Sequence, residues 1–496
     1  MKTGRVLFIG AGPGDPTLLT IKGMEALRQA DVVVYDRLAN PQLLSHVRRD
    51  ARFIYCGKES DRHTIPQDEI NRILIREAQI GQTVVRLKGG DPSVFGRVGE
   101  EALMCQQHGI PYEIIPGITS GIAAPLYAGI PLTHREHSSS VAFITGHLCE
   151  KNSGKELDWA ALARVETLVI YMGVKNLPYI REKLLTSGKS PSVPVALVRW
   201  GTLAEQKTLV GTLETIDKQA ADAGFAAPAI IVIGDVVGLR DSLNWYESKP
   251  LFGHRVAVAS LAREGEGIAA VLAGLGADLL TIPLVEKGMS AAPDREGVPI
   301  DLDAYEWLVF GDERQVSFFF QELRKRRYDL RRLRGKIAAR GMLAAEELER
   351  RGVYPELVLK ETAPLASVHQ TLPVGNGSRV LVMANDKCKV VLHAQGTALH
   401  MVQAGVVEWD RVHPVAALLA ERPIDWLAAD DPYVLPALAE FAGSSWENKT
   451  ILCIGNETAI RAREMGWASV IECTAIKDDL VRRVHALLTG MPHALM

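Results

Sequence analysis

Residues 5–16 read RVLFIGAGPGDP, an apolar run that ends in a loop of glycine, proline and aspartate. The run predicts a buried strand that stops at a tight turn, because glycine permits backbone conformations other residues avoid. Two nearby runs repeat the pattern: VVVY at 32–35 ends on DR, and VVRL at 84–87 ends on KGGDP. Open α/β sheets bind ligands outside the carboxyl ends of their strands. The chain therefore predicts a small-molecule enzyme with its site in these loops.

Length and patterning predict more than one domain. A chain of 496 residues exceeds the roughly 250–300 residues that a single core reaches. Strand-like runs alternate with helical patterns, as in α/β domains. The first part predicts helices over 18–30, 67–80 and 100–108, and later strands over 141–146, 167–173, 193–201 and 229–234. The break near residues 244–254 divides the chain into two halves of ordinary domain size.

The second half predicts two similar α/β lobes. A strand at 255–260, a helix and an apolar run at 279–285 indicate a βαβ unit. Residues 336–341 and 450–455 then resemble each other, since each is a strand that ends at a glycine and leads into a helix.

Composition excludes several function classes. A net charge of −3 gives no general reason to expect nucleic acid, and no apolar stretch reaches the roughly 20 residues of a membrane helix. A strand begins within a few residues of the N-terminus, which leaves no room for a signal peptide. The six cysteines show no CxxC spacing, so neither a metal site nor a disulfide framework is expected. These features favour a cytoplasmic protein.

The individual candidate residues each admit two interpretations. Pro13 and Pro16 lack the amide donors that a pyrophosphate needs, so the 10–15 loop is a structural turn or a site for a cationic ligand. Asp36 is a carboxylate facing a cleft or a helix cap. Lys58, which follows another strand-to-glycine exit, is a site residue or a solvated lysine.

Two further loops also admit either a structural or a ligand-binding interpretation. The paired glycines before Asp91 indicate close backbone approach to a ligand, or a tight turn. Thr119 and Ser120 cap a helix or bind a ligand.

The order and spacing of these motifs resemble the tetrapyrrole methylase family over residues 4–247. The matching segments are GAGPGDP at 10–16, VVYDRL at 33–38, GK at 57–58, RLKGGDPxxFGR at 86–97, PGITS at 116–120, GIPLTHR at 129–135, TGH at 145–147, LVIYMG at 168–173 and VVGLRDxLNW at 236–245. The resemblance is to the members that methylate uroporphyrinogen III at two pyrrole carbons, giving precorrin-2 for sirohaem and cobalamin synthesis. A later methylase that acts on cobalt-precorrin is the rival within the same class.

The resemblance implies a fold, a cofactor and a set of site residues. The fold would be a two-lobed α/β methylase domain over 1–248, with S-adenosylmethionine between the lobes and a homodimer as the usual assembly. Asp36 and Lys58 match the proton acceptor and donor, and Arg37 and Arg135 are candidate clamps for the carboxylates of the substrate. The positions that match the cofactor site are Pro13, Gly89, Gly90, Asp91, Val94, Thr119, Ser120, Met172 and Gly201.

The second half, over 254–490, more loosely resembles the uroporphyrinogen-III synthase family. That resemblance implies a two-lobed α/β domain, one lobe built from both ends of the segment, that converts hydroxymethylbilane into the methylase substrate. The family's threonine and serine after the strand at 307–310 are replaced by Gly311 and Asp312, whereas Thr458 is retained as a candidate substrate contact. Two hypotheses follow: residual synthase activity, or a degenerate binding or dimerisation module.

Overall fold

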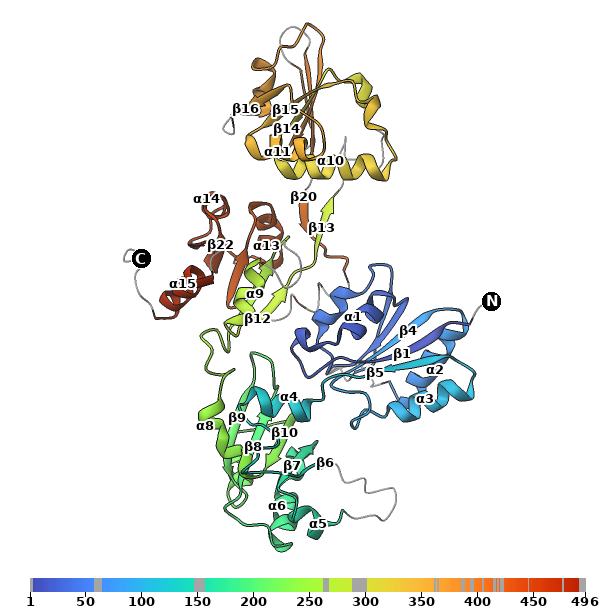
Figure 1. The fold of residues 1–496 in the computed structure, drawn as a ribbon, viewed down its shortest axis with the longest axis vertical. Helices are drawn as coiled ribbons and strands as arrows, with labels where there is room; N and C mark the ends of the chain where they lie inside the picture. The colour runs from blue at the N-terminus through green and yellow to red at the C-terminus, as the bar shows by residue number, and fades with distance from the viewer. Residues whose placement is uncertain are drawn as a thin grey trace. The chain divides into compact units, whose positions relative to one another are not determined.

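A computed structural model of the chain describes residues 3–57, 65–146, 157–261, 267–287, 301–360, 363, 365–384, 389–392, 397–403, 406–413, 416, 419, 423–444, 446–474 and 477–489. The backbone forms two compact units (Figure 1). One contains Met1–Pro283 and Arg411–Met496, and the other contains Leu284–Asp410. No helix within these described ranges is both long and apolar enough to cross a membrane.

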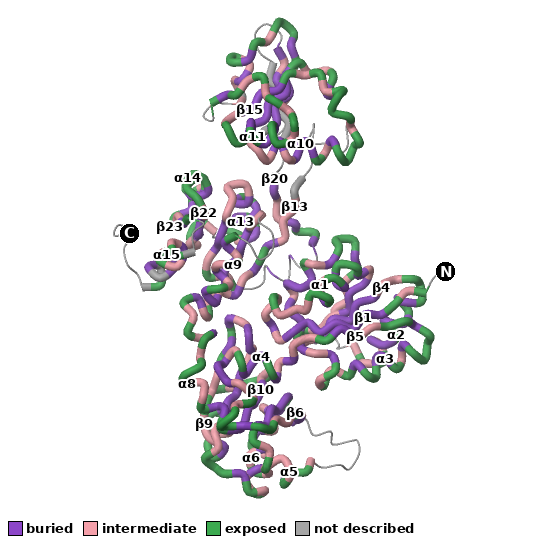
Figure 2. The backbone as a smooth tube through the Cα atoms, in the orientation of Figure 1, coloured by how far each residue is buried: buried purple, intermediate pink, exposed green. Residues whose placement is uncertain are grey.

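The first sheet is parallel and has the strand order β3-β2-β4-β1-β5. Its strands are β1 (Arg5–Gly10), β2 (Val32–Tyr35), β3 (Arg52–Tyr55), β4 (Thr83–Lys88) and β5 (Tyr112–Ile115). Helices of this part are α1 (Ile21–Arg28), α2 (Gln67–Gln79), α3 (Val98–Gln107) and α4 (Ser120–Tyr127). Five of the six residues of β1 are buried, as Figure 2 shows for the centre of the sheet. The apolar runs therefore form the centre of a parallel sheet, where both faces are covered.

One predicted helix differs from the structure. Residues 18–30 do not form a single helix: a short 3₁₀ turn spans Pro16–Leu18, and α1 begins only after Thr20. The Thr20 hydroxyl accepts a hydrogen bond from the Gly23 amide and so caps α1. Threonine at this position satisfies an amide that the helix leaves unpaired, which sets the start of the helix.

The second sheet is mixed and has the order β6-β7-β10-β8-β9. Its strands are β6 (Val141–Thr145), β7 (Thr167–Tyr171), β8 (Pro194–Arg199), β9 (Lys207–Thr212) and β10 (Ala229–Ile233). The accompanying helices are α5 (Trp159–Ala163), α6 (Leu177–Thr186), α7 (Ile216–Asp222) and α8 (Arg240–Leu243). All strand pairs except β6–β7 are antiparallel, so β8 and β9 form a hairpin at one edge of the sheet.

The third sheet is parallel and combines strands from both ends of the second half. Its order is β12-β11-β21-β22-β23, from β11 (Arg255–Ala259), β12 (Asp278–Thr281), β21 (Trp426–Ala429), β22 (Thr450–Ile454) and β23 (Ser469–Cys473). Its helices are α9 (Gly267–Gly274), α13 (Leu435–Ala442), α14 (Asn456–Met465) and α15 (Lys477–Thr489). The predicted run at 279–285 is divided: β12 ends before Pro283, a residue that has no amide to donate to a ladder.

The second compact unit contains a six-stranded sheet and a two-stranded ribbon. The sheet order is β16-β15-β14-β17-β19-β18, from β14 (Trp307–Phe310), β15 (Lys336–Arg340), β16 (Leu357–Leu359), β17 (Arg379–Ala384), β18 (Lys389–Leu392) and β19 (Ala398–Gln403). The ribbon pairs β13 (Leu284–Lys287) with β20 (Val406–Trp409), and the helices are α10 (Glu313–Lys325) and α11 (Met342–Arg350).

The internal similarity predicted for the second half is confirmed. Strands β15 and β22 each end at a glycine, Gly341 and Gly455, which have φ angles of +81° and +83° and precede α11 and α14. Residues with side chains rarely adopt this left-handed conformation, so glycine is the residue both turns require.

Candidate functional site

The loops that follow β1, β4 and β5 meet through their backbones. The amide of Gly90 donates to the carbonyl of Gly12 at 2.7 Å, and the Gly12 amide returns a bond to the Gly90 carbonyl at 3.2 Å. A Cβ atom on Gly117 would lie 2.4 Å from the Gly90 carbonyl oxygen. No side chain fits at that distance, so the glycines predicted as turn residues also allow three loops to pack together.

Asp91 ties the loop after β4 to the loop before α4. One carboxylate oxygen accepts a hydrogen bond from the Gly117 amide at 2.9 Å, and the other accepts from the Ser93 amide at 2.8 Å. Burial opposes ionisation of this carboxyl group, but bonds from the Ser93 hydroxyl and these amides hold its pKa below the usual value. Asp91 is therefore an anion held in place by amides of two loops.

The second lobe contributes Tyr171, at the end of β7, to the start of α4. Its hydroxyl lies 2.6 Å from the Thr119 hydroxyl and accepts a bond from the Gly121 amide at 2.8 Å. Burial raises the pKa of Tyr171, so the phenol stays protonated near neutral pH. Met172 follows with a left-handed φ of +54° and a 53% exposed side chain. Met172 and Thr119, both predicted cofactor positions, are thus joined through Tyr171.

Gly201 lies against the first loop and against α4. A Cβ atom on Gly14 would lie 3.2 Å from the Gly201 carbonyl oxygen, and one on Gly201 would lie 2.3 Å from the Cβ of Ala124. The Asp15 amide donates to the Thr202 hydroxyl at 2.9 Å. Predicted cofactor positions from both lobes therefore surround one region of the first compact unit.

Asp36 lies at the end of β2 with its side chain 27% exposed. One carboxylate oxygen accepts a hydrogen bond from the Leu38 amide at 3.1 Å within a turn, and no helix begins there, since the next helical turn, Pro41–His46, is capped by Asn40. The other lies 3.3 Å from Nη2 of Arg86, a guanidinium whose side chain is only 5% exposed. Asp36 is therefore not a helix cap but a partly exposed carboxylate that stabilises a turn and is oriented by a buried cation.

A buried network behind Asp36 escaped the sequence reasoning. Glu101 on α3 is fully buried, and its two oxygens lie 2.9 and 3.0 Å from Nζ of Lys88. The Arg86 Nε lies 3.5 Å from the same carboxylate, within ion-pair range. Burial lowers the pKa of Lys88 below its ordinary value. The sequence does carry a signal for this network: Arg86 and Lys88 stand inside an apolar strand, where a buried charge needs a partner.

Other predicted residues lie elsewhere or at the rim. The Arg37 guanidinium carbon lies 6.0 Å from the ring centroid of Trp200, next to Gly201. Pro13 is half-buried, and Val94 packs against the apolar cluster that includes Tyr171. Lys58 lies outside the described residues, and Gly89 is close to Leu38, since a Cβ there would be 2.7 Å from the Leu38 Cβ.

Arg135 and Thr458 are placed differently. Arg135 is exposed, and it lies between His134 and Glu136, which with His137 bring potential metal-ligand atoms within 4.8 Å of one another. The expectation that the protein holds no metal therefore stays a prediction. Thr458 is 2% exposed in the first turn of α14, so its role as a substrate contact also stays a prediction.

Comparison with known proteins identifies relatives of both halves. Residues 5–217 match the family of Tetrapyrrole (Corrin/Porphyrin) Methylases, and residues 266–481 match Uroporphyrinogen-III synthase HemD. A Bacillus subtilis (strain 168) protein named uroporphyrinogen-III C-methyltransferase is 41% identical over 98% of this chain and 97% of its own length.

Two further relatives match only the first half. A siroheme synthase of Methylococcus capsulatus is 50% identical over 50% of this chain and 52% of its own length. The crystal structure of uroporphyrin-III C-methyl transferase from Thermus thermophilus with S-adenyl homocysteine is 39% identical, with a TM-score of 0.41, over 48% of this chain and 100% of that one.

Proposed function

This chain belongs to the family of uroporphyrinogen-III C-methyltransferases, and from that membership we propose that it methylates uroporphyrinogen III at two pyrrole carbons, giving precorrin-2. The 41% identity across nearly the whole chain is the observation that carries the proposal. The relatives named siroheme synthase favour siroheme synthesis as the use of the product.

The proposed cofactor is S-adenosylmethionine, in the region surrounded by the Gly12, Gly90, Thr119, Met172 and Gly201 segments. When bound, it supplies a methyl group on a sulfonium sulfur that an electron-rich carbon attacks. A Cβ at Gly90 would be in van der Waals contact with Ser120 N at 3.6 Å and Thr119 atoms at 3.7 and 4.0 Å, so the Gly90 backbone faces two other predicted cofactor positions. The residues around this space would hold the cofactor and the substrate in a fixed relative position. Such positioning of two reactants speeds the reaction between them.

Asp36 is the proposed proton acceptor. A methylated pyrrole ring carries positive charge and must lose a proton, so the carboxylate receives it from the substituted carbon. The Arg86 Nη2 lies 3.3 Å from one carboxylate oxygen and so orients the group, and a cationic ring is an acid strong enough for a carboxylate to deprotonate. Lys58 is proposed as the proton donor, and Arg37 and Arg135 as clamps for substrate carboxylates.

Replacing Gly90 by valine tests the cofactor site. Gly90 has φ +69°, and the new side chain would project toward Thr119 and Ser120. We expect S-adenosylmethionine affinity to fall by about tenfold or more, that is at least about 1.4 kcal/mol, by isothermal titration calorimetry. Gly109→Val is the matched control, because Gly109 has φ +65° and open space around it. Equal affinity in a folded Gly90→Val protein would refute the site.

For the second half we propose residual uroporphyrinogen-III synthase activity. The match to the synthase family over 266–481 supports it, as does the pair of α/β sheets with strands from both ends of the segment. The replaced hydroxyl positions have taken structural roles: Asp312 caps α10 by accepting from the Gln315 amide at 2.9 Å. Catalysis that depends on holding the substrate in shape is shared among many contacts, so it tolerates such losses.

Incubation of the full-length protein with hydroxymethylbilane tests both activities. Without S-adenosylmethionine we expect the III isomer to form faster than the spontaneous I isomer, and with it we expect the dimethylated product. An Asp36→Asn protein should still make the III isomer, because Asp36 lies in the first half. Formation of the I isomer alone would identify the second half as a degenerate binding module, the alternative function.

A homodimer in the cytoplasm is the proposed setting. The first half exposes Leu126, Leu243 and Trp245 around an apolar pocket of about 360 Å³. Apolar patches of this kind mark interaction surfaces, and a second copy of this chain is the proposed occupant.

A further inference from the structure

Two cations lie opposite each other in the hairpin formed by β8 and β9. Arg199, the last residue of β8, is the direct antiparallel partner of Lys207, the first residue of β9. Side chains of directly opposed residues lie close together on one face, and like charges in this position repel. Within the described residues, neither side chain forms an ion pair with a carboxylate, and the buried Nε of Arg199 has no hydrogen-bond partner.

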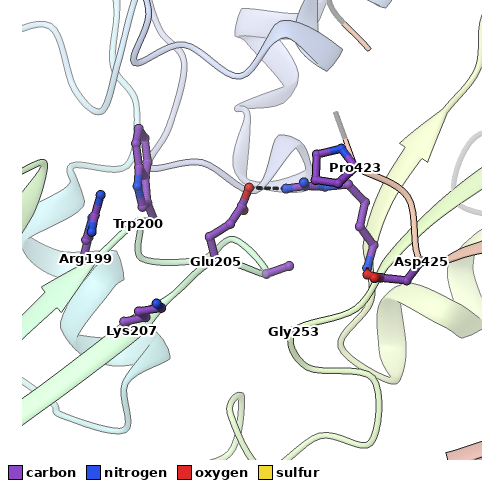
Figure 3. Close-up of a pocket in the computed structure, with 9 residues that line it drawn as sticks. Arg199, Trp200, Glu205, Lys207, Gly253, Pro423 and Asp425 are labelled. Carbon is purple, nitrogen blue, oxygen red and sulfur yellow. Dashed lines mark hydrogen bonds and ion pairs between the residues drawn. The ribbon is translucent and has the colours of Figure 1, made fainter. Parts of the chain in front are cut away.

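These two residues line a cavity of about 440 Å³, drawn in Figure 3. Its other lining residues are Trp200, Ala204, Glu205, Gly253, Arg255, Pro423 and Asp425. The volume lies within the range of small-molecule sites.

Both carboxylates of the cavity contact Arg255, Glu205 through its guanidinium and Asp425 through its backbone amide. The Arg255 side chain, 6% exposed, pairs with Glu205 and with Asp278, and the Arg255 amide donates to Asp425 at 2.7 Å. Figure 3 shows Glu205 between the labelled Arg199 and Lys207 on one side and Pro423 and Asp425 on the other. Three cations, Arg199, Lys207 and Arg255, line the cavity against two carboxylates, Glu205 and Asp425, so its lining carries an excess of positive charge.

Trp200 connects this cavity with the proposed methylation site. One neighbour in the chain is Gly201, a proposed cofactor position, and the Arg37 guanidinium lies 6.0 Å from the Trp200 ring centroid. Trp200 and Thr202 both have left-handed φ angles, +49° and +73°. Such angles cost energy in residues with side chains and persist where surrounding contacts hold them, as the Asp15–Thr202 hydrogen bond does here.

We propose that this cavity binds carboxylate side chains of the tetrapyrrole, with Arg199 and Lys207 as the anion-binding pair and Trp200 as an apolar wall. The inference rests on the proposed function, because the tetrapyrrole is the polycarboxylate that would enter the methylation site as substrate and leave it as product. A carboxylate placed between the two cations would neutralise their charge and relieve the cross-strand repulsion. The pair would then hold substrate or product beside the reacting site rather than within it.

The test uses uroporphyrin III, a stable polycarboxylate tetrapyrrole, as the probe on the full-length protein. In an Arg199→Gln/Lys207→Gln variant we expect uroporphyrin affinity to fall about tenfold, the lower end of what charge-assisted hydrogen bonds contribute. S-adenosylmethionine affinity should not change. The charge-matched control is Arg28→Gln/Lys218→Gln, two exposed positions on α1 and α7. Thermal unfolding supplies a second readout: uroporphyrin should raise the Tm of the parent protein more than that of the pocket variant.

Each outcome decides the assignment. Equal uroporphyrin affinity in parent, pocket variant and control would overturn the proposal. So would citrate or phosphate stabilising the parent as strongly as uroporphyrin at equal ionic strength, since the cavity would then be a site for small anions. Methylation of uroporphyrinogen III by the parent protein is measured in parallel. A parent that methylates while the pocket variant binds normally refutes only the cavity, whereas a parent that does not methylate refutes the proposed function.

Discussion

Replacing Asp36 by asparagine will lower the turnover of uroporphyrinogen III methylation by roughly 10²–10⁴-fold, the contribution of a general acid–base group. The amide cannot accept the proton that the methylated ring must lose. It also has only one oxygen for the two donors that the carboxylate serves, the Leu38 amide and the Arg86 guanidinium. Binding of S-adenosylmethionine should stay near the parent value, because Asp36 lies on the substrate side of the proposed site.

Initial rates and calorimetry separate these two effects. Asp50→Asn is the control for loss of one carboxylate, since Asp50 is 77% exposed and pairs only with the exposed side chain of Arg48 among the described residues. It should leave the rate unchanged. If Asp36→Asn turns over at the parent rate, Asp36 has only a structural role in its turn and the base must be sought elsewhere.

Replacing Glu101 by glutamine will destabilise the first sheet by about 3–5 kcal/mol, the usual cost of removing one partner from a buried ion pair. The change leaves Lys88 and one side of Arg86 without their anion, in side chains that are only 7% and 5% exposed. Hydrogen exchange of the β4 and α3 amides, together with urea unfolding, measures the loss locally. The Asp36 carboxylate should also lose its fixed position, because Arg86 holds it.

The pH dependence of this variant has a definite sign. Burial lowers the pKa of Lys88 in the folded protein, so the unfolded chain binds the proton more tightly. Stability rises with pH wherever the unfolded state holds more protons. Glu101 raises the pKa of Lys88 in the parent protein, so its replacement by glutamine lowers that pKa further. The variant therefore gains more stability than the parent as the pH rises from 7 toward the ordinary lysine pKa, and the deficit of Glu101→Gln shrinks.

Two comparisons isolate the role of the pair. Adding Lys88→Met to Glu101→Gln removes the unpaired ammonium and should recover much of the stability. Glu69→Gln, which breaks an exposed pair with Arg72, should cost less than about 1 kcal/mol. A loss at Glu101 no larger than that at Glu69 would show that the buried network contributes little.

Several features of the fold followed from local sequence. The apolar run at 5–9 and its glycine loop predicted β1 and the turn after it, because strand patterning and left-handed glycines are properties of short segments. Helix α2 spans Gln67–Gln79, within one residue of its prediction. The boundary of α1 was missed, since a capping hydrogen bond at Thr20 decided it and a 3₁₀ turn precedes it.

The candidate site likewise combines features that local sequence predicted with features that depend on distant residues. The loops after β1, β2 and β4 indicated that Gly90 and Asp36 belong to one edge of a sheet. In the structure, β2 and β4, the strands that precede Asp36 and Gly90, are direct neighbours. The roles of the individual residues stay predictions, Lys58 among them. The orientation of the Asp36 carboxylate could not be predicted from neighbouring residues, because its partner Arg86 is 50 residues away in the chain.

The sequence by itself determined several strands, β1, β2 and β4 among them, the loops that carry glycine and aspartate, and the two families that the halves resemble. Only the tertiary structure decided which distant groups meet: the Tyr171 hydroxyl with Thr119, the Glu101 carboxylate with Lys88, and Arg199 opposite Lys207. The physical reason is the range of the interactions involved. Strand period, turn geometry and capping act within a few residues, whereas a charge pair depends on strand order and register, which the packing of the whole core sets.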